Sequence, residues 1–252
     1  MNIEQLFPNV SFKSVTGVVY TDELNPLIDP RKLLTFAGYL HSYSKLPSRL
    51  SSDLLEVMFS ESIGGFRLPG GGKIDIVDGP GKVAYQLKTM TSLTKSIIWG
   101  RIALKDKLAM IPASTISYDI CQLVAKSILS KLREDFIEVL DSFESFRYLQ
   151  LMKDGSDMYL VISEIDLDKL EQFLDTDFMW SWTSKPVNPR KYPSLCGHYK
   201  GQKIFSWSGL SGNHFRILDM GVFLSNVSKK IIGVKIPLSG LTYNIKEISK
   251  RL

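Results

Sequence analysis

The sequence predicts an α/β protein in which a mixed β-sheet is flanked by helices and is followed by a β-rich C-terminal subregion. Two patterns favour this class: apolar residues recur at helical spacing over long segments up to about residue 143, and short runs of strand type dominate later. Size agrees with it, because 252 residues with 44% hydrophobic and 23% charged side chains can bury a sizeable core.

Helices are expected mainly in the first part of the chain. Serine or aspartate precedes several of the periodic segments and is suited to the N-cap, while Gly64-Gly65 ends one of them. The predicted helices lie at residues 31–43, at 51–62, at 91–110, from Ser114 or Ser117 to about 143, and at 167–174 after an Asp166 cap.

Strands are expected as two hairpins and several later segments. A DGPG turn joins the first hairpin, and Asp154-Gly155 joins the second. The predicted strands lie at residues 73–77, 82–90, 147–153, 156–165, 178–182, 203–207 and 229–238.

The first predicted hairpin carries three polar residues within apolar strands. Asp75 alternates with Ile74 and Ile76, so its side chain lies on the opposite face from theirs. Gln86 and Lys88 are separated by one residue and project from one face of the second strand. If the strands pair through the turn, Asp75 lies near both. An ordinary hairpin with a polar face is the alternative interpretation.

These groups have the chemistry of a Mg²⁺ site. Asp75 offers a carboxylate, Gln86 an amide oxygen and Leu87 a main-chain carbonyl, all of them oxygen ligands suited to Mg²⁺. Such a metal lowers the pKa of a bound water and stabilises the charge that grows on a phosphate. Lys88 would orient the attacking water or stabilise the phosphate electrostatically.

One carboxylate and one neutral amide make a sparse cage for a divalent cation, so a second acid is expected. The predicted helix at residues 51–62 supplies the candidates. Glu56 is preferred, acting through the metal or its waters, and Glu61 and Asp53 are the competitors. For Glu56 the alternative is a solvated helix residue with no ligand.

The order of these features resembles that of the PD-(D/E)xK nuclease superfamily. It consists of a helix with Glu56, a glycine-rich loop, Ile74-Asp75, ten intervening residues and then Gln86-Leu87-Lys88. Ile74 stands in place of the family's Pro and Gln86 in place of its acid, a QxK variant similar to that of some restriction enzymes and Mrr-type nucleases. The resemblance covers residues 53–90. It implies a restriction-endonuclease-like core of βαβ type with its site at the strands, and Mg²⁺-dependent hydrolysis of phosphodiester bonds.

The formal net charge of +5 is unevenly distributed along the chain. Residues 1–177 hold 19 basic and 24 acidic residues, whereas residues 178–252 hold 12 basic and 2 acidic residues. No acid occurs from Phe178 to Leu218. This segregation favours a polyanionic partner for the C-terminal third. A basic surface that only confers solubility is the alternative.

The acid-free segment combines basic and amide side chains with many aromatic ones. Lys and Arg make phosphate contacts, and Asn, His and Arg can reach base edges in the major groove. The predicted DNA contacts are Lys185, Asn188, Arg190, Lys191, His198, Lys200, Lys203, Asn213, His214 and Arg216. The aromatic residues, including Trp180, Trp182 and Trp207, are expected to form a core in preference to a base-stacking surface.

These observations lead to one functional hypothesis with two alternatives. Residues 1–177 would form a catalytic α/β nuclease core, and residues 178–252 a DNA-recognition region continuous with it or packed on it. The protein would be a type II restriction enzyme, a site-specific endonuclease of double-stranded DNA in a restriction-modification system, acting as a monomer or a homodimer. The alternatives are a modification-dependent, Mrr-like nuclease that senses a base in an aromatic pocket, and a non-catalytic DNA-binding protein.

The expected compartment is the cytoplasm. No run approaches the roughly 18 apolar residues of a membrane span, and the first residues show no basic region followed by an apolar one. Cys121 and Cys196 fit no CxxC pattern and are expected to be free thiols.

Overall fold

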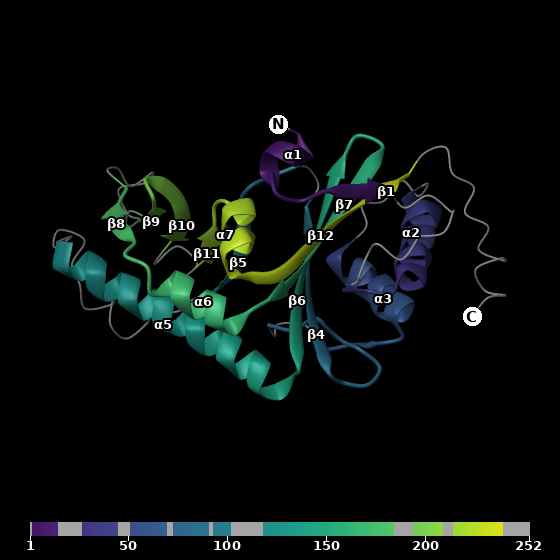
Figure 1. Ribbon diagram of the computed structural model, residues 1–252, viewed down its shortest axis with the longest axis horizontal. Helices are drawn as coiled ribbons and strands as arrows, with labels where there is room; N and C mark the ends of the chain where they lie inside the picture. Colours follow the sequence, from purple (N-terminus) through teal and green to yellow (C-terminus); the bar gives the residue numbers. More distant parts are fainter. Residues whose placement is uncertain are drawn as a thin grey trace. The chain divides into compact units, whose positions relative to one another are not determined.

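A computed structural model of the protein describes residues 2–14, 27–44, 51–69, 73–90, 93–101, 118–183, 194–208 and 214–238. The chain forms two compact units, each assembled from separated parts of the sequence (Figure 1). Unit 1 comprises Met1–Leu93, Val139–Ile165 and Ser228–Leu252. Unit 2 comprises Thr94–Glu138 and Asp166–Val227.

Unit 1 is built on a mixed sheet. Its strands are β1 (Phe12–Ser14), β2 (Phe66–Arg67), β3 (Ile76–Val77), β4 (Val83–Met90), β6 (Ser145–Asp154), β7 (Asp157–Ile165) and β12 (Ser228–Pro237), in the order β1-β12-β7-β6-β4-β3-β2. The pairs β1·β12 and β4·β6 are parallel, and the other neighbouring pairs are antiparallel. The β3–β4 and β6–β7 hairpins therefore lie where the sequence predicts them.

The helices α2 (Pro30–Ser44) and α3 (Ser52–Ile63) cover one face of this sheet (Figure 1). Edge-to-face ring contacts join the layers, with Phe36 of α2 against Phe59 of α3 at 5.2 Å between ring centroids and Phe59 against Tyr85 of β4 at 5.6 Å. The short helix α1 (Ile3–Leu6) begins at an Asn2 cap. The contact between Phe59 and Tyr85 holds α3 against the strand that carries the predicted site residues.

The helix α3 has the ends that its sequence predicts. The Ser51 hydroxyl accepts a hydrogen bond from the N–H of Leu54 at 3.2 Å, which satisfies one of the free N–H groups of the first turn. At the other end Gly64 adopts a left-handed conformation with φ +65°, which residues with a side chain rarely adopt. The next residue, Gly65, donates to the Ser60 carbonyl at 2.8 Å and leads into β2.

Side chains of β4 alternate between the two faces of the sheet. Tyr85 and Leu87 belong to the apolar cluster beneath α2 and α3. Because successive strand residues point to opposite faces, Gln86 and Lys88 lie on the face away from these helices. The neighbouring strand β6 repeats the pattern, with Leu149 and Leu151 in the cluster and the even-numbered residues opposite.

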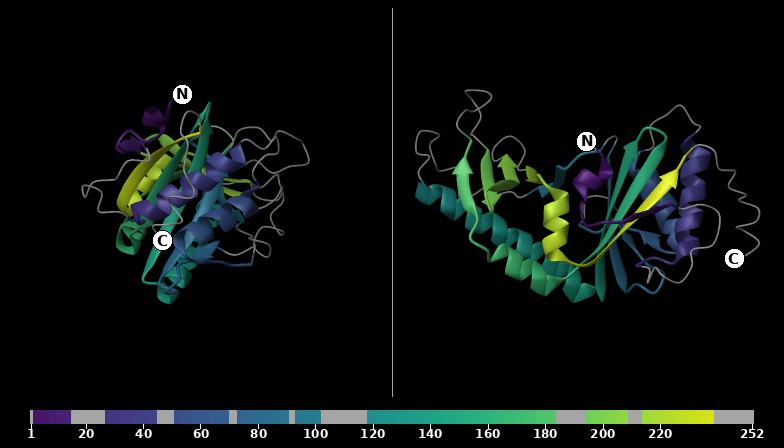
Figure 2. Two further views of the ribbon diagram at one scale, coloured as in Figure 1. Left: turned by 90° about the vertical axis from the view of Figure 1, so that its right-hand side faces the viewer. Right: turned by 45° about the horizontal axis from the view of Figure 1, so that its top comes forward.

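Unit 2 is built on an antiparallel sheet. Its strands are β5 (Ile97–Arg101), β8 (Met179–Trp182), β9 (Leu195–Tyr199), β10 (Gln202–Ser208) and β11 (His214–Ile217), in the order β5-β11-β10-β9-β8. Its helices are α6 (Leu167–Leu174), α7 (Met220–Val227) and α5 (Tyr118–Ser142), of which the last turn, from Val139, belongs to unit 1. Figure 2 shows the strands of this sheet from two further sides.

Aromatic rings form the core of unit 2. Phe173 of α6 contacts Phe178, Tyr199 and Phe205, with centroid distances of 5.3, 5.1 and 6.2 Å. Trp180 and Trp207 are buried as well, with 6% and 1% of their surfaces exposed. The interpretation as core residues is therefore confirmed for Trp180 and Trp207, whereas Trp182 is only partly buried.

One predicted helix is wrong within the described residues. The segment predicted as a helix at 91–110 contains β5, which pairs with β11; residues 91–92 and 102–110 lie outside the described ranges. Ile97 is buried, Ile98 is 40% exposed, and Trp99 stacks on Phe136 at 5.2 Å, so the side chains alternate with the period of a strand. A short apolar run fits either period, and here pairing with β11 decides.

Smaller differences concern lengths and missed elements. The strand predicted at 73–77 extends only over Ile76–Val77. The elements α1, α7, β1, β2, β9 and β11 were not predicted. The other predicted helices that fall within the described residues, at 31–43, 51–62 and 167–174 and in the region up to 143, are found with ends shifted by a few residues at most. No helix in the described part of the chain is long and apolar enough to cross a membrane.

The compact units differ from the division expected near residue 178. Strand β12 lies beyond that position but completes the sheet of unit 1, whereas β5 and most of α5 precede it and belong to unit 2. The residues of unit 2 number 14 basic and 11 acidic, a net of +3. The acids of α5 and α6 thus fold together with the basic aromatic segment, and the charge contrast along the sequence is largely averaged in space.

Candidate active site

The turn between β3 and β4 is held by a single aspartate. Asp78 Oδ1 accepts hydrogen bonds from the N–H groups of Lys82 and Val83 at 2.7 and 2.9 Å, and Gly81 has φ +74°. Asp78 is therefore a turn residue, as its position in the sequence predicts. The turn fixes the register, in which Ile76 pairs with Tyr85 and Val77 with Ala84.

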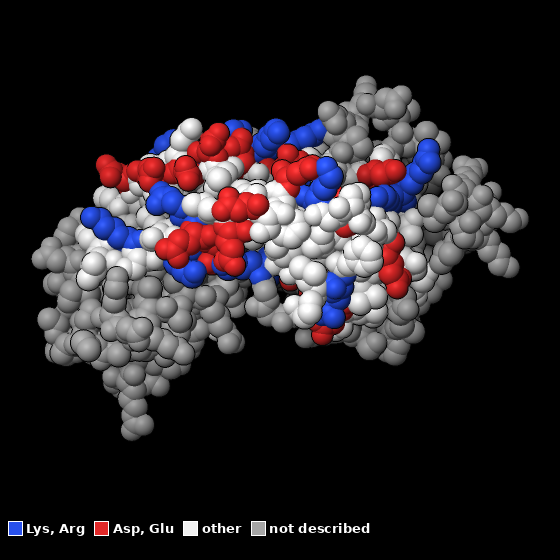
Figure 3. Space-filling view, turned by 90° about the horizontal axis from the view of Figure 1, so that it is seen from below, with Lys and Arg blue, Asp and Glu red and all other residues white. Residues whose placement is uncertain are grey.

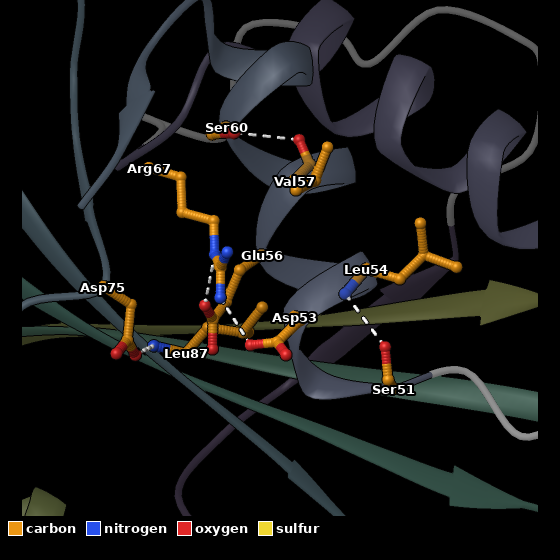
Figure 4. A network of polar contacts seen from close by, with 9 residues as sticks. All are labelled: Ser51, Asp53, Leu54, Glu56, Val57, Ser60, Arg67, Asp75 and Leu87. Atoms are coloured by element: carbon orange, nitrogen blue, oxygen red, sulfur yellow. Dashed lines mark hydrogen bonds and ion pairs between the residues drawn. The ribbon is translucent and has the colours of Figure 1, made fainter. Parts of the chain in front are cut away.

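Asp75 lies just before β3 and is bound to β4 through both its main chain and its side chain. Its N–H donates to the Tyr85 carbonyl at 2.9 Å. Its carboxylate Oδ2 accepts from the N–H of Leu87 at 2.8 Å (Figure 4). The side chain thus continues the pairing between the two strands beyond the end of β3, and its orientation is fixed.

Burial and several charged groups shift the pKa of Asp75. Partial burial raises the pKa of Asp75 above its usual value, while the positive charge of Lys88, the hydrogen bond from Leu87 and the charge of Arg67 act in the opposite direction. The negative charge of Glu56 adds to the increase. The carboxylate is therefore partly desolvated and incompletely neutralised, a condition that favours a bound cation.

Gln86 and Lys88 occupy the positions that the hairpin pattern predicts. Both lie on the face of β4 away from α2 and α3; Gln86 is 5% exposed and Lys88 is half-buried. In the parallel pairing with β6, Gln86 lies opposite Tyr148 and Lys88 opposite Gln150. Burial and the charge of Asp75 raise the pKa of Tyr148, so this phenol lies within the field of the same carboxylate.

The acid of the α3 helix is paired with an arginine. Glu56 Oε2 accepts from Arg67 Nε at 2.8 Å, and the Arg67 guanidinium also bonds Asp53 (Figure 4). Of these acids, Glu56 is 12% exposed and Asp53 74%. Glu61, the other competitor, is exposed. Glu56 is thus the partly buried acid that acts electrostatically on Asp75.

Arg67 is the functional-site residue that sequence reasoning missed. It lies on β2, the edge strand beside β3, and its charge acts on both Glu56 and Asp75. Asp53 and Glu56 are spaced i, i+3 and share one side of α3. A pair of acids with this spacing, followed by a lone arginine after the helix stop, is the signal that could have indicated the contact.

Three oxygen donors are available to a hard cation at this site. They are the carboxylates of Asp75 and Glu56 and the main-chain carbonyl of Leu87. In a strand the N–H and C=O of one residue point to the same side, so the carbonyl of Leu87 faces the side from which its N–H reaches Asp75. No group of three or more His, Cys, Asp or Glu side chains among the described residues could hold a metal. The set fits Mg²⁺ only with the carbonyl and water as further ligands.

The predicted DNA contacts fall into two groups. Lys185, Asn188, Arg190, Lys191 and Asn213 lie outside the described residues. His198, Lys200, Lys203, His214 and Arg216 lie in or beside the sheet of unit 2.

The described residues of this set differ in their surroundings. Lys203 and Arg216 are exposed. His198 Nδ1 lies 3.1 Å from the Met179 carbonyl, and the Lys200 ammonium lies 5.0 Å from the centre of the Tyr199 ring. Lys203 and Arg216 are therefore the residues of this set best placed for phosphate contacts.

Acidic and basic side chains are intermingled on the described part of the face shown in Figure 3. On α5, Lys131 pairs with Asp135 at 3.0 Å and Arg133 with Asp175 at 2.5 Å. Such a mixed surface offers little attraction to a polyanion. A nucleic-acid contact of unit 2 is thus better sought on its strands than on α5.

Comparison with known proteins gives no relative for this chain. No family model, no curated protein and no solved structure matches it.

Proposed function

We propose that the protein is a Mg²⁺-dependent endonuclease that hydrolyses phosphodiester bonds of double-stranded DNA at a specific sequence, as type II restriction enzymes do. The observation that carries the proposal is the desolvated Asp75 carboxylate, which Leu87 orients and which lies within the fields of Lys88 and Glu56. Partly buried acids beside a lysine are the groups that bind a hard cation and act on phosphate.

The connections around β4 support the same function. Strands β4 and β6 are parallel neighbours, and the chain between them contains β5 and α5. Two parallel strands joined by a connection that contains a helix agree with the βαβ-type core that the resemblance to PD-(D/E)xK nucleases implies. The helix α3 with Glu56 precedes these strands in sequence, also as the resemblance implies. The type II restriction assignment rests on this likeness together with the site.

Each residue has a definite part in the proposed reaction. Asp75, Glu56 and the carbonyl of Leu87 would hold the metal, which when bound lowers the pKa of a coordinated water and stabilises charge on the phosphate. Lys88 stabilises the same developing charge through its ammonium group. Gln86 positions water or metal through its amide oxygen. Lys203 and Arg216, with the predicted contacts outside the described residues, would bind the DNA backbone and read base edges.

The decisive test is cleavage of plasmid DNA by the purified protein in MgCl₂, with and without EDTA, followed by sequencing of the ends. Asp75→Ala and Lys88→Ala should each abolish cutting while DNA binding survives. Asp154→Asn and Lys153→Ala, at exposed positions of the β6–β7 hairpin, serve as matched controls and should cut normally. A wild-type protein that binds DNA but never cuts it would establish the non-catalytic alternative.

The modification-dependent alternative lacks a specific observation in its favour. It requires an aromatic pocket, but Trp180 and Trp207 are buried in the core of unit 2 and Trp182 is partly buried. Comparison of cleavage on methylated and unmethylated plasmid distinguishes the two kinds of nuclease. We expect the unmodified plasmid to be cut.

A further inference from the structure

Strand β6 holds a buried amide with an unused acceptor. Gln150 is 0% exposed, and its Nε2 makes a weak contact with Met152 Sδ at 3.4 Å. Its Oε1 has no hydrogen-bond partner among the described residues. An unpaired buried carbonyl destabilises a fold, so this sheet carries a polar group that packing alone does not explain.

The position of Gln150 relative to the proposed site is defined by the strand register. In the parallel β4·β6 pair it lies directly opposite Lys88, and both residues are on the face away from α2 and α3. Neighbouring strands are about 4.8 Å apart, and a lysine side chain has four flexible methylene groups. The Lys88 ammonium, which has three donors and no acceptor, can therefore reach the Gln150 amide oxygen.

We infer that Gln150 is a positioning residue for Lys88: its amide oxygen accepts from the Lys88 ammonium and fixes that group beside the Asp75 carboxylate. The inference rests on the proposed nuclease function, and it adds a residue that the PD-(D/E)xK-like pattern of the hairpin does not contain. Full burial excludes contact between Gln150 and DNA. Its effect on the reaction must therefore act through its neighbour on β4.

If Gln150 had a purely structural role, its replacement would lower stability and leave the reaction rate unchanged. Gln150→Leu removes the unpaired oxygen and fills a similar volume with an apolar side chain, so the fold is expected to be as stable as wild type or more stable. A side chain that is dispensable for folding but required for the rate is a functional residue. The variant thus separates the two roles in one protein.

The test compares wild type, Gln150→Leu and the matched control Ser145→Ala. Ser145 lies on the same strand, opposite Val83 at its far end, and its Oγ is likewise buried without a partner among the described residues. We expect Gln150→Leu to lower the single-turnover rate of plasmid cutting by roughly ten- to a hundredfold with unchanged DNA affinity. Ser145→Ala should leave both unchanged. An equal loss of rate in the two variants, or none in Gln150→Leu, overturns the inference.

A second readout does not depend on cutting. The rate at which an amine-acylating reagent modifies Lys88, followed by mass spectrometry, reports how far the amine is held in contact with its neighbours. Loss of the acceptor in Gln150→Leu should free the amine and raise this rate by roughly three- to tenfold. If wild type never cuts DNA but the Lys88 rate rises, the contact is established and the nuclease function fails. If wild type cuts and the Lys88 rate is the same in both proteins, the contact is refuted.

Discussion

The carboxylate of Asp75 accepts a hydrogen bond from the main-chain N–H of Leu87 at 2.8 Å. The Asp75 N–H still bonds the Tyr85 carbonyl, and the acidic side chain then takes the place of a main-chain carbonyl in binding the N–H of Leu87. One carboxylate oxygen is thereby bonded to β4, and within the described part of the chain the other oxygen has no hydrogen bond. Asp75 combines a structural contact with incomplete charge compensation, and this combination makes its effects on stability and activity separable.

Replacement of Asp75 by Asn should stabilise the fold and abolish the proposed activity. The Asn amide oxygen can still accept from Leu87, but the cost of burying a charge is removed. We expect a higher melting temperature at neutral pH, measured by differential scanning calorimetry. Cutting in MgCl₂ should fall at least about a hundredfold because the carboxylate ligand is lost.

The pH dependence of this stabilisation has a defined sign. Burial raises the pKa of Asp75 in the folded state above its unfolded value, so the folded protein binds more protons between these values and is destabilised as pH rises through them. The gain of Asp75→Asn over wild type should therefore grow from acid to neutral pH and disappear below the unfolded pKa. A gain that is constant with pH would mean that the charge of Asp75 is not its source.

Removal of Arg67 should strengthen Mg²⁺ binding. Its guanidinium neutralises Glu56 and its charge also acts on Asp75, so it competes with a cation for the same acids. In Arg67→Ala the Mg²⁺ concentration for half-maximal thermal stabilisation should fall roughly three- to tenfold, about 0.7–1.4 kcal/mol.

Arg133 is a closely matched control for Arg67. Arg133 pairs with Asp175 with side-chain exposures of 31% and 72%, against 30% and 74% for Arg67 with Asp53. Arg133→Ala thus removes an equivalent surface ion pair and should not change the Mg²⁺ requirement. Weaker Mg²⁺ binding in Arg67→Ala would show that the arginine supports the site and does not compete for it.

The sheet of unit 2 can be tested through salt dependence. Lys203 and Arg216 are exposed on β10 and β11. If each contacts one phosphate, Lys203→Ala and Arg216→Ala should each reduce the slope of log K against log[salt] by about 0.9. Lys153→Ala, on the β6–β7 hairpin of unit 1, should leave the slope unchanged. Slopes equal to wild type in both variants would remove these strands from the DNA interface.

The sequence predicted the parts of the site that local patterns define. Alternation over two short strands and a turn aspartate are enough to bring Asp75 within the field of Lys88, because a hairpin is closed by a few adjacent residues. The Arg67 contact was not predictable in this way. It depends on β2 lying beside α3, and that placement requires the close approach of Gly65 to the Val77 carbonyl of β3.

Pairing between strands far apart in the sequence explains the larger errors of the prediction. The run around Ile97 and Ile98 fits a helix or a strand, and only its partner β11, more than a hundred residues later, selects the strand. Likewise the sequence places β12 in the basic C-terminal region, but this strand pairs with β7 and belongs to unit 1. The distribution of charge along the sequence therefore did not predict the boundaries of either compact unit.

The consecutive glycines after α3 should differ sharply when each is replaced by alanine. A Cβ at Gly64 would meet no atom within 4 Å, so Gly64→Ala costs only the strain of its left-handed φ of +65°, about 1 kcal/mol. A Cβ at Gly65 would lie 2.4 Å from the Val77 carbonyl oxygen. Gly65→Ala must therefore displace β2 from β3, and we expect a loss of about 2–4 kcal/mol in urea unfolding. Because Arg67 lies two residues further along the chain, the same displacement should release Glu56 and lower the Mg²⁺ requirement as Arg67→Ala does. Equal stabilities of the two alanine variants would show that β2 can move away from β3 without loss of stability. The position of β2 would then not explain the contact between Arg67 and Glu56.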